Sequence, residues 1–188
     1  TNGITPWFTI TFQKQAESQA VEESQVRLRG QRILVVDPSP VARRATHDML
    51  TVWGARADEA ANGDEALAEL ERAVEANDPF QVAIIDMDLP GENGEKLGAR
   101  INGVQSLSST RLMLLTGVGR RGDASRVQGL GFSAYLIKPI RWTELHDALT
   151  QVVRTDPANA EAALVTRHSI AEQRRNSVRI LVVDDDPV

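Results

Sequence analysis

Short, nearly continuous runs of apolar residues alternate along the chain with longer stretches in which apolar residues recur every three or four positions. The apolar runs cover residues 33–36, 82–85, 112–115 and 135–137, and a weaker run covers residues 56–59. Such short runs without a polar face are typical of parallel strands buried on both sides of a sheet. The pattern therefore predicts five strands, of which 56–59 is an edge strand.

The stretches between the strands have helical periodicity and cover residues 41–53, 64–76, 95–101, 123–130 and 142–153. When strands alternate with helices, the strands form a parallel sheet and right-handed crossovers place the helices on both of its faces. We predict an α/β fold with a doubly wound, five-stranded parallel sheet in the strand order 2-1-3-4-5.

An internal repeat sets the expected domain organisation. The segment Arg32-Ile-Leu-Val-Val-Asp37-Pro-Ser-Pro-Val41 returns as Arg179-Ile-Leu-Val-Val-Asp184-Asp-Asp-Pro-Val188. A repeat of this kind indicates an array of similar units. We expect one complete domain at 31–153, a linker at 154–178 and the first strand of a second, truncated unit at 179–188. Residues 13–30, rich in Gln, Glu and Ser, suit another linker, and 1–12 alternate like a terminal strand of an upstream domain.

The composition of the chain excludes several classes of protein. The chain has 188 residues, 41% of them hydrophobic, which suits one well-buried core. Its net charge of -5 argues against a nucleic-acid surface, which needs clustered Lys and Arg. There are no cysteines for disulfides or thiolate metal sites, and no apolar run approaches the roughly 18 residues of a membrane span. We expect a cytoplasmic fragment that contacts neither nucleic acid nor membrane.

Four polar residues each follow a different predicted strand directly: Asp37, Asp86, Thr116 and Lys138. The carboxyl ends of parallel strands meet at one edge of the sheet, and the binding crevice lies where the winding reverses, here between the first and third strands. Asp37 and Asp86 should be neighbours there. Adjacent carboxylates repel unless a cation lies between them, which predicts Mg²⁺, with Lys138 and Thr116 facing an incoming anion. A carboxylate, a divalent cation and a lysine favour phosphoryl transfer with Asp86 as nucleophile.

Several separated motifs in residues 31–153 resemble the receiver domain of two-component signalling, the response-regulator or CheY-like family with its flavodoxin-like fold. Ile-Ile-Asp86-Met-Asp-Leu-Pro90-Gly, followed by Gly94, resembles the strand and loop of the phosphoacceptor. Leu-Leu-Thr116-Gly resembles the segment with the switch threonine, and Ala-Tyr135-Leu-Ile-Lys138-Pro139 the segment with the switch aromatic residue and the family's lysine.

The resemblance implies a role for each of these residues. Asp86 would take a phosphoryl group from a histidine, and Asp37, Asp86 and the backbone carbonyl of Asp88 would bind Mg²⁺. Thr116 would move toward the phosphoryl group and Tyr135 would turn inward behind it. The Lys138–Pro139 peptide would be cis, a conformation that proline makes accessible.

The chain departs from the family pattern after the first strand. Receivers carry two acids there, as the second copy does with Asp184-Asp185, whereas Asp37 is followed by Pro38. The resemblance implies that the second acid binds the metal directly. Losing even a group that only supports a ligand costs ~10 to 100-fold in metal affinity, so we expect Mg²⁺ to bind weakly or not at all. The domain is then either a phosphoacceptor or a degenerate regulatory receiver, in which Asp37 serves only to hold Lys138.

Two other motifs overlap these residues. The Asp86-Met-Asp88 pair resembles the nucleophile of haloacid-dehalogenase-like phosphatases, but Leu-Pro follows it. The segment Gly117-Val-Gly119-Arg-Arg-Gly122 matches the glycine pattern of a dinucleotide-binding fingerprint, but it follows the fourth predicted strand and not the first.

A cationic and aromatic surface is a further candidate site, because arginine forks pair with guanine edges and aromatic rings stack on bases. Such a surface could bind a nucleotide messenger such as cyclic di-GMP, or dock a neighbouring domain. Its candidate residues are Arg120, Arg121, Tyr135, Arg141 and Trp142.

The two ends of the chain suggest the context of the domain. Gly3-Ile-Thr-Pro-Trp-Phe-Thr-Ile-Thr-Phe12 resembles the last strand of a histidine kinase ATP-binding domain. In hybrid histidine kinases, the end of the kinase domain is followed by a receiver, a linker and a second receiver, which is the order expected here. No phosphoacceptor histidine box and no ATP-binding loops occur in the 188 residues, so we expect no enzyme activity from this fragment. Its expected partners are the kinase core and the second receiver of the same chain.

Overall fold

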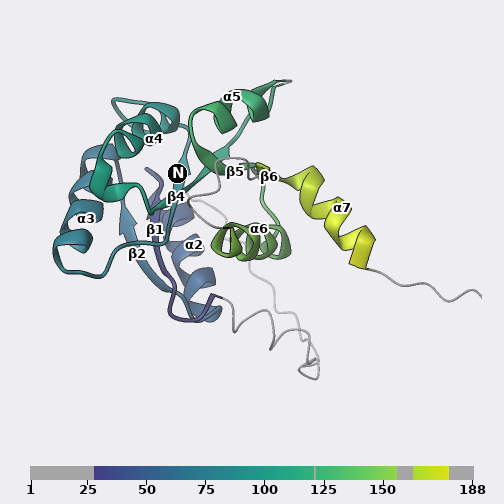
Figure 1. Ribbon diagram of the computed structural model, residues 1–188, viewed down its shortest axis with the longest axis horizontal. Helices are drawn as coiled ribbons and strands as arrows, with labels where there is room; N and C mark the ends of the chain where they lie inside the picture. Colours follow the sequence, from purple (N-terminus) through teal and green to yellow (C-terminus); the bar gives the residue numbers. More distant parts are fainter. Residues whose placement is uncertain (1–27, 121, 156–162, 178–188) are drawn as a thin grey trace, which may run out of the picture.

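The computed structural model describes residues 28–120, 122–155 and 163–177, which form a parallel sheet flanked by helices (Figure 1). The strands lie in the order β2-β1-β3-β4-β5-β6. Their bounds are β1 Arg32–Val36, β2 Arg56–Ala60, β3 Val82–Asp86, β4 Arg111–Thr116, β5 Phe132–Ile137 and β6 Val165–Thr166. The predicted order of the first five strands is confirmed, with β2 at one edge of the sheet.

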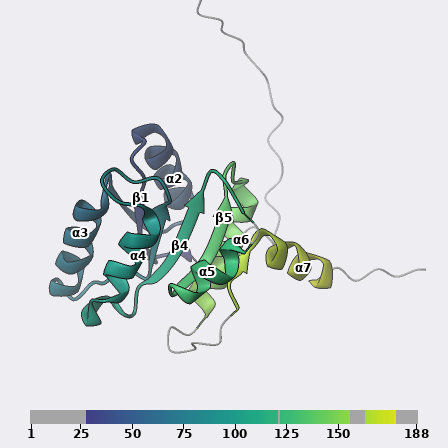
Figure 2. The same ribbon diagram turned by 90° about the horizontal axis from the view of Figure 1, so that it is seen from above.

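Helices cover both faces of the sheet, as Figure 2 shows for α2 and α4 on opposite sides of the strands. The helices are α2 Pro40–Val52, α3 Gly63–Glu75, α4 Gly94–Asn102, α5 Asp123–Gly129, α6 Trp142–Arg154 and α7 Arg167–Ser177, with a short 3₁₀ turn at Gln105–Leu107. Apolar residues of α3, α4 and α5 pack on one face of the sheet, and those of α2, α6 and α7 pack on the other. The doubly wound arrangement predicted from the sequence is therefore confirmed.

Side-chain caps define where the helices at the carboxyl edge of the sheet begin. The Asn62 and Asn93 side chains accept hydrogen bonds from backbone N–H groups of α3 and α4, at 2.9 Å in each case. Ser39 accepts a weaker one from Ala42 N at 3.4 Å, and Pro40 follows as the first residue of α2. Asn and Ser satisfy N–H groups that have no partner inside the helix, and proline suits the first helical position. The loops at this edge are therefore held by local hydrogen bonds.

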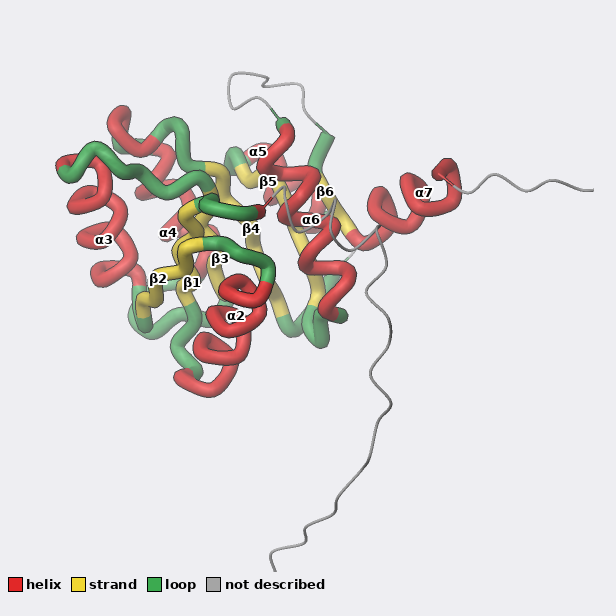
Figure 3. Tube along the Cα trace, turned by 90° about the horizontal axis from the view of Figure 1, so that it is seen from below, coloured by secondary structure: helices red, strands yellow, loops and turns green. Residues whose placement is uncertain are grey.

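Part of the expected linker at 154–178 folds onto the domain, with a strand that the sequence did not predict. Val165–Thr166 adds a sixth strand parallel to β5, with Val165 opposite Ala134 and Thr166 opposite Tyr135. Helix α7 follows directly and extends away from the sheet beyond β6 (Figure 3). The physical cause is three apolar side chains that become buried, Leu164, Val165 and Ile170. A two-residue strand is too short for its alternation to be recognised in the sequence.

Three expectations lie wholly or partly outside the described residues. They are the upstream strand at 1–12, most of the linker at 13–30, and the second receiver strand at 179–188. In the part of the chain that the structure describes, no helix has the length and apolar content needed to span a bilayer.

Candidate functional site

Two aspartates lie side by side at the carboxyl edge of the sheet, as predicted. Asp37 follows β1 and Asp86 ends β3, and these strands pair in parallel from Ile33 and Val82 onward. Only 6% of the surface of each aspartate is exposed. Two carboxylates this deeply buried require a cation or strong hydrogen-bond donors, because an unpaired buried charge is costly.

Lys138 supplies that cation. Its ammonium group donates to Asp37 Oδ2 at 2.9 Å and also to Asp86 Oδ2. Lys138 directly follows β5, and its backbone N–H donates to the Thr116 carbonyl at 2.7 Å, which ties it to the end of β4. The Lys138–Pro139 peptide is cis, as the resemblance implied. The predicted cluster thus contains an ion triad, Asp37–Lys138–Asp86.

The triad favours the protonated form of Lys138. Burial disfavours the ammonium form, but the hydrogen bonds to Asp86 and Asp37 and the attraction of both carboxylates outweigh it, so the pKa of Lys138 lies above its ordinary value. Lys138 is therefore a fixed positive charge at neutral pH. It neutralises part of the repulsion between the two aspartates.

The remaining carboxylate oxygens are also engaged. Asp37 Oδ1 accepts from the backbone N–H of Ser39 at 2.8 Å, and Asp86 Oδ1 accepts from that of Asp88 at 2.7 Å. The Asp88 side chain is exposed, as is Pro38, which stands where a second acid would be. Among residues 28–120, 122–155 and 163–177, no group of three or more His, Cys, Asp and Glu side chains could hold a metal ion. Each of the four oxygens of the two buried carboxylates accepts one hydrogen bond, two of them from Lys138 and two from backbone N–H groups. Asp37 and Asp86 therefore remain the two acids that could hold Mg²⁺ at this edge, without a third carboxylate at position 38.

Thr116 ends β4 one residue beyond Leu115, which is the register partner of Asp86. It is 3% exposed. Its hydroxyl donates to the Val118 carbonyl at 3.0 Å and accepts from the Val118 N–H at 3.2 Å. The structure therefore places Thr116 at the predicted edge, with its hydroxyl bonded within its own loop.

Tyr135 points into the protein, and its side chain packs with the cluster on the α3–α5 face. Its hydroxyl donates to Asp123 Oδ2 at 3.1 Å. Burial, together with that hydrogen bond and the charge of Asp123, raises the pKa of Tyr135 to about 12. The tyrosine is thus held inward by the first residue of α5.

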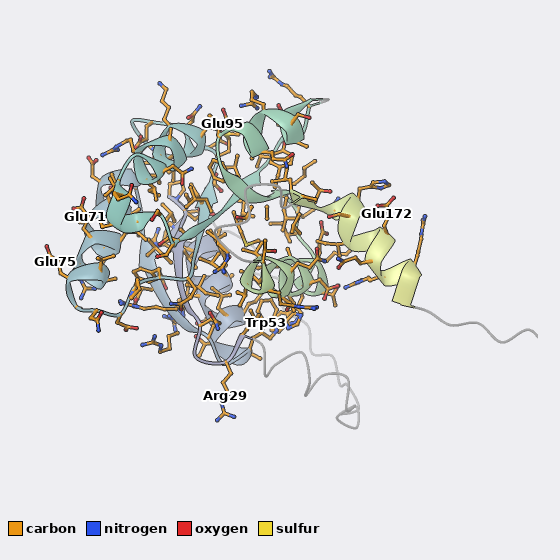
Figure 4. The ribbon with its side chains drawn as sticks, viewed as in Figure 1. Arg29, Trp53, Glu71, Glu75, Glu95 and Glu172 are labelled. Atoms are coloured by element: carbon orange, nitrogen blue, oxygen red, sulfur yellow. The ribbon has the colours of Figure 1, made fainter. Side chains whose placement is uncertain are left out.

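Asp123 is the centre of a small network at the start of α5. Arg126 and the backbone N–H of Arg120 both donate to its carboxylate at 2.7 Å, and in that order these bonds lower the pKa of Asp123. Arg126 also pairs with Glu95 of α4, which Figure 4 labels near the top of the view. The network joins α4, α5 and Tyr135 by charge-assisted hydrogen bonds.

The predicted cationic and aromatic surface does not form as one face. Tyr135 is buried on the α3–α5 side of the sheet, whereas Trp142 packs edge-to-face on Trp53, on the α2–α6 side, with ring centroids 5.0 Å apart. Arg120 and Arg141 are exposed, and Arg121 lies outside the described residues. The prediction failed because it followed order along the chain, whereas Tyr135 and Trp142 take opposite sides of the sheet.

Sequence reasoning missed two arginines that contact the site from outside the motifs. Arg43 of α2 donates to the Asp37 backbone carbonyl at 2.6 Å and to Glu59 of β2 at 3.1 Å. Arg167 of α7 donates to the carbonyls of Ile137 and Pro139, on either side of Lys138. Both bind backbone carbonyls, which leave no pattern of residue types in a sequence.

Comparisons with known proteins agree with this geometry. The profile of the response regulator receiver domain family matches residues 33–150. The transcriptional regulatory protein ResD of Bacillus subtilis is 34% identical over 110 residues, or 57% of this chain and 42% of ResD. The sensor protein TorS of Escherichia coli is 34% identical over 76 residues, or 40% of this chain and 8% of TorS.

A solved structure, the chemotaxis response regulator CheY4 of Vibrio cholerae, is similar with a TM-score of 0.59 and 25% identity. The match covers 65% of this chain and 98% of the CheY4 chain. The chain spans less than half the length of the curated relatives ResD and TorS, at 42% and 8%.

Proposed function

This chain belongs to the response regulator receiver domain family, and we propose that residues 31–153 act as a degenerate regulatory receiver within a hybrid histidine kinase, with Asp86 a weak phosphoryl acceptor. Receiver domains are signalling modules that work with histidine kinases and in general use Mg²⁺ for phosphorylation. The proposal concerns how far this member keeps that chemistry. It assigns no catalytic turnover to the fragment itself.

The observation that carries the proposal is the Asp37–Lys138–Asp86 triad beside Pro38. With no acid at position 38, the lysine is the cation that neutralises the pair of carboxylates. A divalent cation would have to bind beside the positively charged lysine without help from an acid at position 38. Losing a ligand should weaken Mg²⁺ binding by at least ~10 to 100-fold.

A placement inside a hybrid kinase is supported by order along the chain and by one relative. The first twelve residues resemble a kinase strand, and the last ten repeat the first strand of the receiver. The similar protein TorS is a sensor protein. We propose that phosphotransfer ends on the second receiver, in which Asp184-Asp185 follows the first strand. The first receiver would then control the activity of the kinase.

A second candidate is that Asp86 does accept a phosphoryl group. Its support is the placement of Asp86, Thr116 and Lys138 at one edge of the sheet. In this version Asp86 is the nucleophile and the Lys138 ammonium pairs with the transferred group, which is the division of roles expected at a phosphoryl-transfer site.

Restoring the missing acid separates the two candidates. Pro38→Asp should raise Mg²⁺ affinity at least tenfold, measured from amide signals of Asp86 during a titration. Beryllofluoride with Mg²⁺ should then perturb Asp86, Thr116 and Tyr135 in the variant far more than in the unaltered chain. Pro40→Asp is the control, because it adds the same charge at the first position of α2, where an acid is tolerated.

The opposite result would favour the phosphoacceptor. If the unaltered chain responds to beryllofluoride at low Mg²⁺ as strongly as Pro38→Asp does, position 38 is not limiting and the degenerate version is wrong. In the complete protein, Asp86→Asn should leave most phosphotransfer intact, whereas deleting residues 31–153 should change kinase output. Loss of relay in Asp86→Asn would contradict the gating role.

Binding of a nucleotide messenger such as cyclic di-GMP has weaker support, because Tyr135 is buried and bonded to Asp123 and Trp142 stacks on Trp53. A well-formed arginine pair to guanine contributes ~1 to 3 kcal/mol. Calorimetric titration of the chain with cyclic di-GMP tests it directly. Micromolar binding that is lost in Arg141→Ala would support a messenger site at the exposed Arg141, and no heat would rule out cyclic di-GMP as a ligand of the chain.

A further inference from the structure

A strap of chain, residues 164–177, covers the β5 edge of the sheet and lies beyond the region that the family profile matches, 33–150. It comprises Leu164, β6 and α7. Leu164 packs on the α3–α5 side, whereas Val165 and Ile170 pack on the α2–α6 side, with 9%, 6% and 3% of their surfaces exposed. The strap is therefore anchored on both faces of the sheet.

The turn between β6 and α7 is closed by reciprocal hydrogen bonds. The Thr166 N–H donates to Ser169 Oγ at 2.9 Å, and the Ser169 N–H donates to Thr166 Oγ1 at 3.3 Å. This is the pattern of a capping box, with serine in place of the usual acid or amide. It fixes the direction of the first turn of α7, where Arg167 lies.

Arg167 continues the contacts of β6 along the edge of β5. Its Nη2 donates to the carbonyls of Ile137 at 3.0 Å and Pro139 at 3.2 Å, the residues on either side of Lys138. Its Nε donates at 2.6 Å to Glu144, a carboxylate of α6 that is 7% exposed. Because Glu144 is buried, its pairing matters more than an exposed surface ion pair would.

The turn that Arg167 holds is the same turn that presents Lys138 to the carboxylates. On its inner side, the Lys138 ammonium binds Asp37 and Asp86, and on its outer side Arg167 binds the neighbouring carbonyls. The turn thus joins two sets of charge-assisted hydrogen bonds. A shift of the Lys138 backbone would also move the adjoining carbonyls that Arg167 contacts.

We propose that Arg167 is a positioning residue for Lys138, and that docking of the strap is coupled to the state of the Asp37–Lys138–Asp86 triad. Loss of the lysine's contacts loosens the turn and favours release of α7. Undocking of α7 loosens Lys138 by the same factor, because coupling between two sites is reciprocal. The coupling goes beyond the proposed function, since it holds whether or not Asp86 is phosphorylated.

The packing around α7 is compatible with release. A groove of about 420 Å³ remains between the start of α6 and the strap, lined by Ile140, Arg141, Thr143, Ile170 and Ala171 among others. Helix α7 thus rests on a few anchors and ion pairs. Loss of the Arg167 contacts should be enough to change how often it opens.

The first experiment acts on the strap and observes the site. In the 188-residue chain, Arg167→Ala should shift the amide NMR signals of Lys138 and Asp86, and Arg167→Lys should rescue them only in part, because lysine lacks the planar fork. The matched control is Arg174→Ala, which removes another arginine of α7, with donors to Asp147 and the Thr143 carbonyl of α6. Shifts confined to 163–177 in Arg167→Ala, or equal shifts of Lys138 in the control, would overturn the positioning role.

The second experiment acts on the site and observes the strap. Lys138→Met should speed hydrogen exchange of the amides in 164–177 about tenfold, equivalent to about 1.4 kcal/mol. Asp37→Asn, which keeps an acceptor for Ser39, serves if Lys138→Met does not fold, and should give a smaller increase. Amides of the buried central strand β3 report global stability. Strap exchange that stays unchanged, or that rises only in parallel with β3, would overturn the coupling, whereas a selective rise supports it.

Discussion

Gly94 offers a sharp test of how the backbone around Asp86 is packed. It is the first residue of α4, and its N–H donates to the Met87 carbonyl at 2.9 Å. A Cβ built at this position would lie 2.4 Å from the backbone oxygen of Asp86 and 2.9 Å from Leu114 Cδ1. The backbone oxygen cannot rotate away as a flexible side chain would. Gly94→Ala must therefore move α4 or the end of β3.

The expected magnitude follows from two opposed effects. Replacing glycine by alanine in a helix favours folding by at most about 1 kcal/mol. Forcing an extra carbon into a well-packed site costs ~1 to 3 kcal/mol, and contact with a backbone atom places Gly94 at the upper end. The net result should be a loss of about 2 kcal/mol in the free energy of unfolding. Gly129→Ala is the control, because no heavy atom lies within 4 Å of its Cβ position and it too is helical.

Urea unfolding followed by circular dichroism measures both variants. Gly94→Ala should unfold at lower urea than the unaltered chain with an unchanged slope, and Gly129→Ala at equal or higher urea. Amide signals of Asp86 should shift in the first variant alone. If Gly94→Ala proves as stable as the unaltered chain, the close approach of α4 to Asp86 is wrong. If both variants lose the same stability, the loss does not come from packing at the site.

Three further predictions follow from other contacts. Tyr135 is the single tyrosine of the chain, so ultraviolet titration should give one tyrosinate midpoint at about 12, and Asp123→Asn should lower that midpoint. Because folding raises the pKa of Tyr135, its contribution to the free energy of unfolding is complete below about pH 10 and is lost as the pH rises toward 12. Lys138→Met should lower the urea midpoint, because two buried carboxylates lose their cation; a variant as stable as the unaltered chain would refute the electrostatic role. Trp142→Ala should change the emission of Trp53 and cost about 0.5 to 1.5 kcal/mol beyond the lost burial, and an unchanged spectrum would contradict the edge-to-face contact.

The strands and the site were predictable to different degrees. The central strands are five to six residues long and mostly apolar, so their number and order followed from the sequence, as did the meeting of Asp37, Asp86 and Lys138 at one edge. Strand β6 was missed because it has only two residues. The role of Arg167 was missed because it binds carbonyls, which every residue has.

The contacts of the two acids show a different limit of sequence reasoning. The sequence predicts that Asp37, Asp86 and Lys138 meet, but not that the Lys138 ammonium bonds to both carboxylates at once. The donors from Ser39 and Asp88 could not be predicted either, because they are backbone groups whose direction depends on the turns after β1 and β3.

The two edges of the sheet affect how readily the domain aggregates by strand pairing. An open strand edge is a template for pairing with another chain. On one side, β2 carries charged residues, among them Arg56, Asp58 and Glu59. On the other side, β5 is covered in part by a strand of only two residues, after which the chain turns into α7. Both edges of the sheet are thus poor templates, so two copies of this domain that meet at high concentration should not join their sheets into one.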